Sequence, residues 1–213
     1  MPVITRARHW SRRAAVAATA LATALALGGA ASAGSAAPGN RLTPFTLTSP
    51  DFHDGGKLPV WTEFGGTYGG QHSHCDGKNL APELDWHNAP AGTKSYVLLV
   101  NDMDAPIAGG WHHWVVYDIP GNVDRLKGHG KLEYTQGSTS WDANGLPVVG
   151  WGGPCPPATG QVHHYIFTLY ALDSATVPVP GDSLSYEQLI STIDPDVLGS
   201  TVIIGTFRLP QKA

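Results

Sequence analysis

The chain has 213 residues, 42% of them hydrophobic, and carries 13 Lys and Arg against 17 Asp and Glu, so its formal net charge is −4. An acidic chain without a basic stripe gains nothing from phosphate backbones, which argues against nucleic-acid binding. The 26 glycines and 17 prolines indicate a protein rich in loops.

The first 33 residues have the layout of a secretory signal peptide. A basic segment (residues 6–13) precedes an apolar, alanine-rich run (14–27), and residues 31–33 (Ala-Ser-Ala) offer a small-residue cleavage pattern. The run is too short for a comfortable membrane span, which favours cleavage over an uncleaved anchor. The adjacent arginines, Arg12 and Arg13, are compatible with export by the twin-arginine route as well as by the general (Sec) secretory route. We therefore predict a secreted or extracytoplasmic protein with no transmembrane segment after signal removal.

Removal of residues 1–33 takes away four arginines and no acid, which leaves nine basic against 17 acidic residues, a charge of −8. Residues 34–41 are small, polar and contain Pro and Gly, as in a flexible N-terminal segment. The remaining residues 42–213 show no internal repeat or second linker, and about 170 residues can bury one core. We expect a single domain over this range.

Short apolar runs separated by Gly, Pro, Asn and Asp predict strands. The predicted strands are 42–49, 94–101, 112–119, 164–172 and 201–209, with shorter ones near 57–60 and 132–134. The run over 164–172 is apolar on both faces and should be an interior strand. We predict a mostly β fold, an antiparallel two-sheet β-sandwich with one or two short helices.

One helix is expected near the C-terminus. Ser185 followed three residues later by Gln188 forms a capping-box pattern at the start of an apolar run. Asp194-Pro195 should end this helix, since the residue before a proline disfavours the helical conformation.

Cys75 and Cys155 are the two cysteines of the chain. In an oxidising compartment this count favours one disulfide between them. Two free buried thiols, or one thiol acting as a nucleophile or metal ligand, are the alternatives. His72 and His74 precede Cys75 and could bind zinc or copper with it. A disulfide would remove the thiolate, so we interpret residues 71–76 as a solvated loop.

Standard enzyme motifs are absent: there is no Gly-x-Ser-x-Gly, phosphate-binding Gly-rich loop, His-Glu-x-x-His or Cys-x-x-Cys. Polar segments instead flank the predicted strands, at residues 101–106, 111–117 and 153–165. With a period of two, Asp102 shares a face with Asp104, and His163 with Tyr165. A polar network that only satisfies itself is the simpler interpretation, but three such segments beside Pro- and Gly-rich loops favour a ligand site.

These segments resemble the phosphatidylethanolamine-binding protein (PEBP) family, above all its bacterial, Raf-kinase-inhibitor-like branch. The resemblance rests on Asp102-x-Asp104-Ala105-Pro106, Trp111-His112-His113-Trp114, the segment 153–160 and His163-His164-Tyr165, with residues 79–86 and Cys75 in support. It extends over residues 45–209, nearly the whole mature chain.

The resemblance implies a β-sandwich with a shallow pocket for phosphate-like or carboxylate-like anions. Carried over by motif position, the ligand-binding residues are Asp102, Asp104, His113, Gly153, Pro154, His163 and Tyr165, with residues 153–157 as one wall. Two features depart from the family pattern. Met103 stands where the family usually has proline, and the segment 138–149, with Trp141, Asn144 and Pro147, looks longer than its bacterial counterpart.

The residue types suit such a pocket. His113 and His163 can donate N–H bonds to an anion, and Tyr165 adds a hydroxyl donor. Asp102 and Asp104 fit if they accept imidazole N–H bonds or meet a ligand's ammonium group. A zwitterionic head group such as phosphoethanolamine would satisfy both signs of charge. We expect anion affinity to rise as the pH falls through the histidine range.

We therefore expect a secreted, non-enzymatic binding protein for small anions or phospholipid head groups. Inhibition of a secreted protease, or of another protein partner, through surface loops is an alternative. A metal-assisted hydrolase using Asp102, Asp104 and His113 is a third possibility, but no residue is an obvious separate general base. Nothing in the sequence requires a metal or an organic cofactor.

Overall fold

The computed structural model of the chain describes residues 43–68, 71–129, 132, 134–140, 150–178 and 184–211. The predicted signal peptide, the segment 34–41 and residues 141–149 of the segment 138–149 lie outside these ranges. The elements described below belong to the compact unit of residues 42–213.

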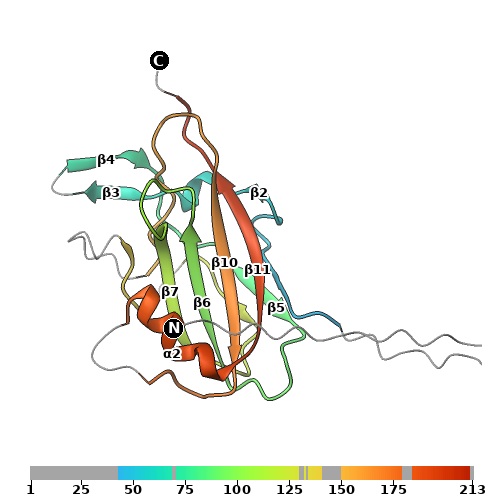
Figure 1. Ribbon diagram of the computed structural model, residues 1–213. Coiled ribbons are helices and arrows are strands. Elements are labelled where there is room, and N and C mark those ends of the chain that lie inside the picture. The colour runs from blue at the N-terminus through green and yellow to red at the C-terminus, as the bar shows by residue number, and fades with distance from the viewer. Residues whose placement is uncertain are drawn as a thin grey trace, which may run out of the picture. The chain divides into compact units, whose positions relative to one another are not determined.

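A six-stranded sheet forms the centre of the fold (Figure 1). Its strand order is β2-β11-β10-β6-β7-β9. The strands are β2 (Gly56–Lys57), β6 (Ser95–Asp102), β7 (Trp111–Pro120), β9 (Thr135–Gln136), β10 (His163–Leu172) and β11 (Val197–Phe207). Neighbours are antiparallel, except that β2 and β11 run parallel. β10 lies between β11 and β6, which confirms the predicted interior strand.

Two smaller sheets complete the β structure. One has the order β1-β5-β8 (Thr46–Thr48, Leu84–His87 and Arg125–Leu126), and the other pairs β3 (Gly65–Tyr68) with β4 (Gln71–Asp76). Leu84 and Trp86 of β5 belong to the same buried cluster as Val100 and Phe167 of the large sheet. Apolar side chains of two sheets thus share one core, which confirms the predicted sandwich.

A helix covers the opposite face of the large sheet. Leu189 of α2 (Tyr186–Ile193) belongs to a second buried cluster with Val97 and Leu99 of β6. Since β6 is covered on both faces, every one of its residues is buried. The capping box forms as predicted: Ser185 Oγ accepts the N–H of Gln188, and the Gln188 side chain accepts the N–H of Ser185.

Several sequence-based boundaries were wrong. The strand expected over 57–60 is β2, which ends at Lys57, and a 3-10 turn (η1, Val60–Thr62) follows. The strand expected near 132–134 is β9, displaced to Thr135–Gln136. The histidine-rich segment, interpreted as a loop, is β4, because it pairs with β3. The helix, in contrast, ends where predicted: α2 finishes at Ile193 with Asp194 as its C-cap, and a 3-10 turn (η2, Asp194–Asp196) leads into β11.

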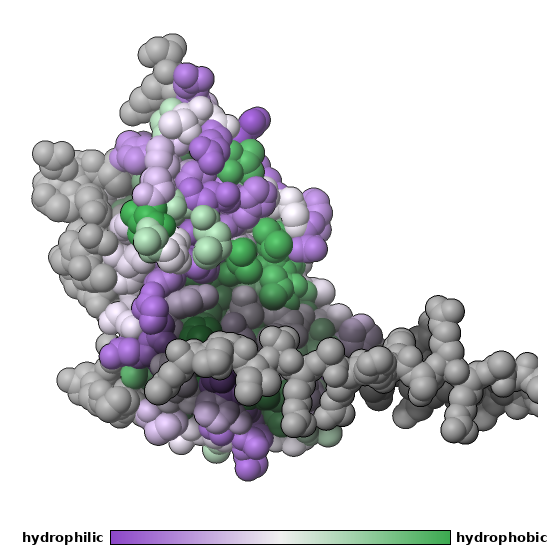
Figure 2. Space-filling view, in the orientation of Figure 1, coloured by the Kyte–Doolittle hydropathy of each residue, from purple (hydrophilic) through white to green (hydrophobic). Residues whose placement is uncertain are grey.

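On the face that Figure 2 shows, hydrophobic residues are interspersed with hydrophilic ones, and few large apolar side chains are exposed in the described residues. In the described residues they are Val60, Met103, Ile107, Val162, Leu198 and Val202. No helix in the described ranges has both the length and the hydropathy of a membrane span.

Candidate functional site

The predicted site residues come from three neighbouring strands at one end of the large sheet. Asp102 ends β6, His163 and Tyr165 lie at the start of β10, and His113 lies near the start of β7. In Figure 1 this is the end to which β6 points, where β3 and β4 also lie. These four side chains are almost fully buried, with exposures of 3% or less.

Asp102 and His163 form a buried hydrogen-bonded pair. Nδ1 of His163 donates to Oδ2 of Asp102 at 2.7 Å. The other carboxylate oxygen, Oδ1, accepts the backbone N–H of Asp104 at 2.9 Å. Because the carboxylate uses the Nδ1 hydrogen, it fixes the tautomer and leaves Nε2 for another partner.

His113 is held by the backbone of Gly152. Its Nδ1 donates to the Gly152 carbonyl, and the N–H of Gly152 donates to the His113 carbonyl at 2.9 Å. Burial lowers the pKa of His113 to about 4. The ring is therefore neutral near pH 7, and its Nε2 accepts rather than donates a hydrogen bond. The expected donation from His113 to an anion needs a second proton on this ring.

The Tyr165 hydroxyl is buried and makes no hydrogen bond of good geometry among the described residues, although the Asp102 carboxylate lies near enough to interact with it. Its ring meets the His113 ring edge-on, with centroids 4.9 Å apart. Burial, followed by the negative charge of Asp102, raises the pKa of Tyr165, so the hydroxyl keeps its proton. An unpaired buried hydroxyl costs about 1–3 kcal/mol, so this group is the clearest opening for a ligand.

Asp104 does not share a face with Asp102, contrary to the period-two prediction, because β6 ends at Asp102. Its Oδ2 accepts from Nδ1 of His164 at 2.7 Å and from the His164 backbone N–H at 2.8 Å. Burial alone would raise the pKa of Asp104, but the hydrogen bonds from His164 hold it below its ordinary value. The two side chains are 33% and 52% exposed, so they form a pair nearer the surface. His164 was not among the predicted site residues.

Asn79 holds the loop before β10 in place through two hydrogen bonds. The Asn79 amide donates to the Trp151 carbonyl at 3.0 Å, and its Oδ1 accepts the N–H of Gly153 at 2.7 Å. A Cβ on Gly153 would lie 2.0 Å from the Thr62 carbonyl oxygen, so glycine is required there. The Pro154 carbonyl accepts the N–H of Phe64 at 3.0 Å. In the structure, the contacts of Gly153 and Pro154 thus position the loop.

Trp151 is a neighbour of the site that the sequence reasoning missed. Its ring lies 6.3 Å from that of His113 and stacks on Phe167, and its Nε1 donates to the Thr62 carbonyl at 3.0 Å. Its position directly before the Gly-Gly-Pro segment was the feature of the sequence that could have indicated its place near the site.

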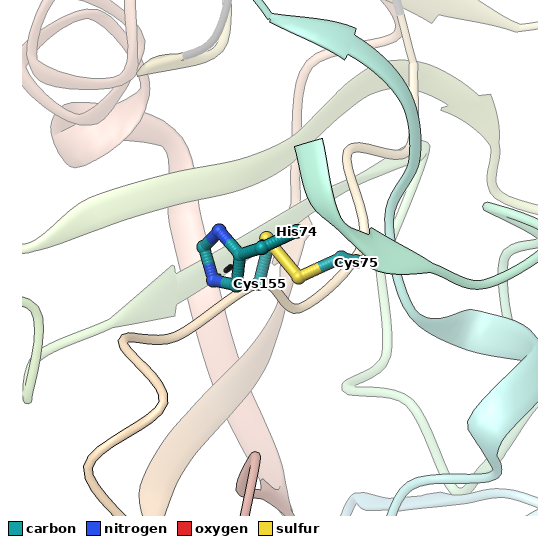
Figure 3. A group of neighbouring side chains, drawn as sticks. All are labelled: His74, Cys75 and Cys155. Carbon is teal, nitrogen blue, oxygen red and sulfur yellow. Dashed lines mark hydrogen bonds between the residues drawn. A yellow bond between two sulfur atoms is a disulfide. The ribbon is translucent and has the colours of Figure 1, made fainter. Parts of the chain in front are cut away.

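The disulfide between Cys75 and Cys155 joins β4 to the same loop, as the sequence predicted. Figure 3 shows the His74 ring beside it. His74 Nε2 lies 3.2 Å from the Pro156 carbonyl oxygen and 3.7 Å from Cys155 Sγ. The side chain of His72 lies outside the description. Among the described residues, His74 and the two cysteines are the one group of three metal-binding side chains whose ligand atoms lie within 4.8 Å of one another.

Comparison with known proteins decides the family. A family model described as phosphatidylethanolamine-binding protein matches residues 48–208. The chain belongs to the PEBP family. Its resemblance to that family, first noted in the motifs around Asp102 and His163, is thereby confirmed.

Three PEBP relatives show how far the similarity extends. Escherichia coli YbcL is 37% identical over 142 residues, covering 65% of this chain and 74% of YbcL. The UPF0098 protein of Methanothermobacter thermautotrophicus is 35% identical over 166 residues, or 76% and 97% of the two chains. LppC of Mycobacterium tuberculosis, named as a candidate lipoprotein, is 36% identical over 172 residues, or 80% and 76%.

Solved structures confirm the PEBP-like β fold. The crystal structure of E. coli YbcL, described as a member of the mammalian PEBP family, superposes with a TM-score of 0.67 at 29% identity, covering 78% of this chain and 98% of YbcL. A PEBP homologue from Chlamydia trachomatis gives 0.63 at 28% identity, covering 77% and 97%.

Proposed function

We propose that this PEBP-family protein is exported and binds a small phosphate-bearing ligand, best represented by a phosphoethanolamine head group, at Asp102, His113, His163 and Tyr165. The supporting observation is the Tyr165 hydroxyl, which is buried and makes no hydrogen bond of good geometry among the described residues. The two histidines beside it use Nδ1 for protein contacts and keep Nε2 available.

These atoms complement a phosphate monoester. The Tyr165 hydroxyl donates to a phosphate oxygen, and His163, backed by Asp102, donates once Nε2 is protonated. Neutral His113 accepts from a phosphate O–H or an ammonium group. The carboxylate of Asp104, partly exposed, attracts the ammonium end while it stays paired with His164. A carboxylate ligand offers no hydrogen to His113, so it should bind more weakly.

Gly153 and Pro154 serve in this proposal as the wall of the site. A loop that holds the Gly152 carbonyl in place also holds His113, because that carbonyl accepts from the His113 ring. Met103 lies between Asp102 and Asp104 and is proposed to adjust access to the site.

Export is part of the proposal. The N-terminal basic and apolar segments, cleavable after Ala33, form an export signal. The disulfide fits the same proposal, because disulfides persist in oxidising compartments. The naming of LppC as a candidate lipoprotein points the same way. We assign binding to this protein and no catalytic step.

Calorimetric titration tests the site. Phosphoethanolamine, phosphate, acetate and ethanolamine are titrated into wild-type protein, Tyr165→Phe and Tyr170→Phe. Tyr170 lies on the same strand but packs with the helix-side cluster, so it controls for loss of a hydroxyl. A hydrogen bond to a charged group contributes about 1.5–3 kcal/mol, so Tyr165→Phe should weaken phosphoethanolamine binding at least about tenfold. Unchanged affinity in Tyr165→Phe would reject the site.

A protein partner is the alternative use of this end of the molecule. Met103, Ile107 and Val162 are exposed apolar side chains on the segments that meet where β6 ends and β10 begins. Two results together would favour this alternative. The protein would inhibit a secreted protease and lose this inhibition in Ile107→Asp, and calorimetric titration with the small molecules would show no heat of binding.

A further inference from the structure

We propose that His74, Cys75 and Cys155 form a redox-gated zinc site, in which reduction of the disulfide releases two thiolates that bind Zn²⁺ together with the His74 imidazole. The three side chains come from β4 and from the loop before β10 (Figure 3). This site is separate from the proposed anion site.

The position of His74 carries the proposal. Zinc binds Cys sulfur at about 2.3 Å and His nitrogen at about 2.0–2.1 Å in a tetrahedron, so a sulfur and a nitrogen on one zinc are about 3.5 Å apart. His74 Nε2 lies 3.7 Å from Cys155 Sγ. The imidazole is therefore already at ligand distance while the disulfide is closed. The two sulfurs need to separate to about 3.8 Å across the ion, and all three ligand atoms already lie within 4.8 Å of one another.

The surroundings allow this separation and give a metal access. β4 pairs with β3 in its own two-stranded sheet, so a small shift of β4 leaves the pairing of the large sheet intact. Cys75 is buried, but Cys155 is partly exposed and His74 is exposed. An ion can thus approach from the His74 side.

Acidic groups beside the site favour a cation. Burial, followed by the negative charge of Asp76, raises the pKa of Glu63, while the charge of His74 acts in the opposite direction. The Glu63 carboxyl group therefore lies within electrostatic reach of His74. Water is the proposed fourth ligand.

Binding has one competing contact. A carbonyl only accepts, so in the oxidised protein Nε2 of His74 donates to the Pro156 carbonyl at 3.2 Å. Zinc needs the lone pair of that nitrogen, so the proton must move to Nδ1. Loss of a single neutral hydrogen bond, about 1 kcal/mol, is small beside the affinity of structural zinc sites.

The reaction balances with a dithiol reductant. The dithiol gives two electrons and two protons to the disulfide and becomes a disulfide itself, leaving Cys75 and Cys155 as thiols. Zinc then displaces the two thiol protons and remains Zn²⁺. Either the disulfide or the metal would connect β4 to the loop that holds His113.

Cobalt substitution tests the site directly. The full chain is reduced with a water-soluble phosphine, which is converted to its oxide with oxygen from water, and titrated with Co²⁺. One equivalent should produce thiolate-to-cobalt charge-transfer absorption and tetrahedral visible bands, and Zn²⁺, which binds more tightly, should abolish both. The oxidised protein should show neither. His74→Ala should weaken binding at least about tenfold, His74→Cys should restore it, and His87→Ala, an exposed histidine on β5, should match wild type.

Thermal unfolding provides a second measurement of metal binding that still applies if reduction of the disulfide destabilises the fold. Zinc should raise the melting temperature of the reduced protein and leave that of the oxidised protein unchanged. Recovery of the fold together with the charge-transfer band on adding metal to a reduced, unfolded chain supports the site equally. Absence of the band in the reduced protein, or equal affinity in His74→Ala, would overturn it.

Discussion

Nδ1 of His163 lies 2.7 Å from Oδ2 of Asp102, and both side chains are buried. The carboxylate is satisfied twice, because Oδ1 also accepts the Asp104 backbone N–H. An aspartate at this position thus sets the orientation of the ring and the start of the turn that carries Asp104. The pair is the most completely constrained part of the proposed site.

Replacement of Asp102 by Asn should destabilise the protein and weaken ligand binding. In Asn an NH2 group, which only donates, replaces one of the two accepting oxygens, so either the His163 N–H or the Asp104 N–H loses its acceptor at that position, at about 1–3 kcal/mol. Urea unfolding gives the free energy, and phosphoethanolamine titration gives the affinity. Asp173→Asn, at an exposed position, is the control. Equal stability of the two variants would contradict the role of the pair.

The stability of the protein should fall as the pH drops from about 6.5 to about 4. Burial lowers the pKa of His113 to about 4, below the value of 6.5 for an unperturbed histidine. Between these values the unfolded chain binds the proton and the folded chain does not, so stability is lost as the pH falls. A shift of this size corresponds to about 3 kcal/mol. Burial also lowers the pKa of His112, which adds in the same direction.

His113→Asn isolates the contribution of that ring. The Asn amide can still donate to the Gly152 carbonyl but cannot titrate. Denaturant unfolding at pH 4 and pH 7 should therefore show a smaller pH dependence than in wild type. An unchanged difference between the two pH values would assign the effect to other groups.

Gly153→Ala should destabilise the loop before β10. The new Cβ would lie 2.0 Å from the Thr62 carbonyl oxygen, which belongs to the backbone and cannot move aside cheaply. Overpacking of this kind costs about 1–3 kcal/mol. Gly55→Ala meets nothing within 4 Å and is the comparison, although its φ of 71° adds a backbone penalty. Thermal unfolding should rank Gly153→Ala as the more damaging change, and a reversed order would refute the steric argument.

Removal of the disulfide by Cys75→Ala with Cys155→Ala should lower the unfolding free energy by about 4 kcal/mol in the chain-entropy model. The sulfurs join residues that are 80 apart in sequence, so the unfolded chain gains considerable freedom. Denaturant unfolding of the double variant and the oxidised wild type measures the difference. Phosphoethanolamine affinity should fall as well, because the loop that positions His113 loses one of its attachments. Full affinity in the double variant would show that Asn79 and Phe64 suffice to hold it.

The long strands and the helix were predictable from the sequence because local patterns determine them. β6, β7, β10 and β11 are apolar runs of eight residues or more, and Ser185 with Gln188 marks the helix start. The short strands β3, β5 and β8 carry too few residues for a pattern and exist through their pairing partners. β4 was missed for a different reason, because its histidines suggested a loop.

The site was predictable only in part. The shared face of His163 and Tyr165 follows from strand alternation, and both are buried. The same rule failed for Asp104, because the strand had already ended. The neutral state of His113 could not be foreseen, since it depends on burial and on the carbonyl of Gly152, 39 residues away. Asn79 was equally hidden, because its role depends on a backbone φ of 52° and on a distant loop.

Three attachments of the loop before β10 come from one stretch of chain: the N–H of Phe64, the sulfur of Cys75 and the amide of Asn79. Residues 64–79 and 151–155 should therefore be exchanged together in protein engineering. If residues 151–155 were moved into a relative without residues 64–79, the loop would lack these attachments. The Gly152 carbonyl that orients His113 would then no longer be held in place. Grafts that transfer both segments together should keep the geometry that either segment alone cannot hold.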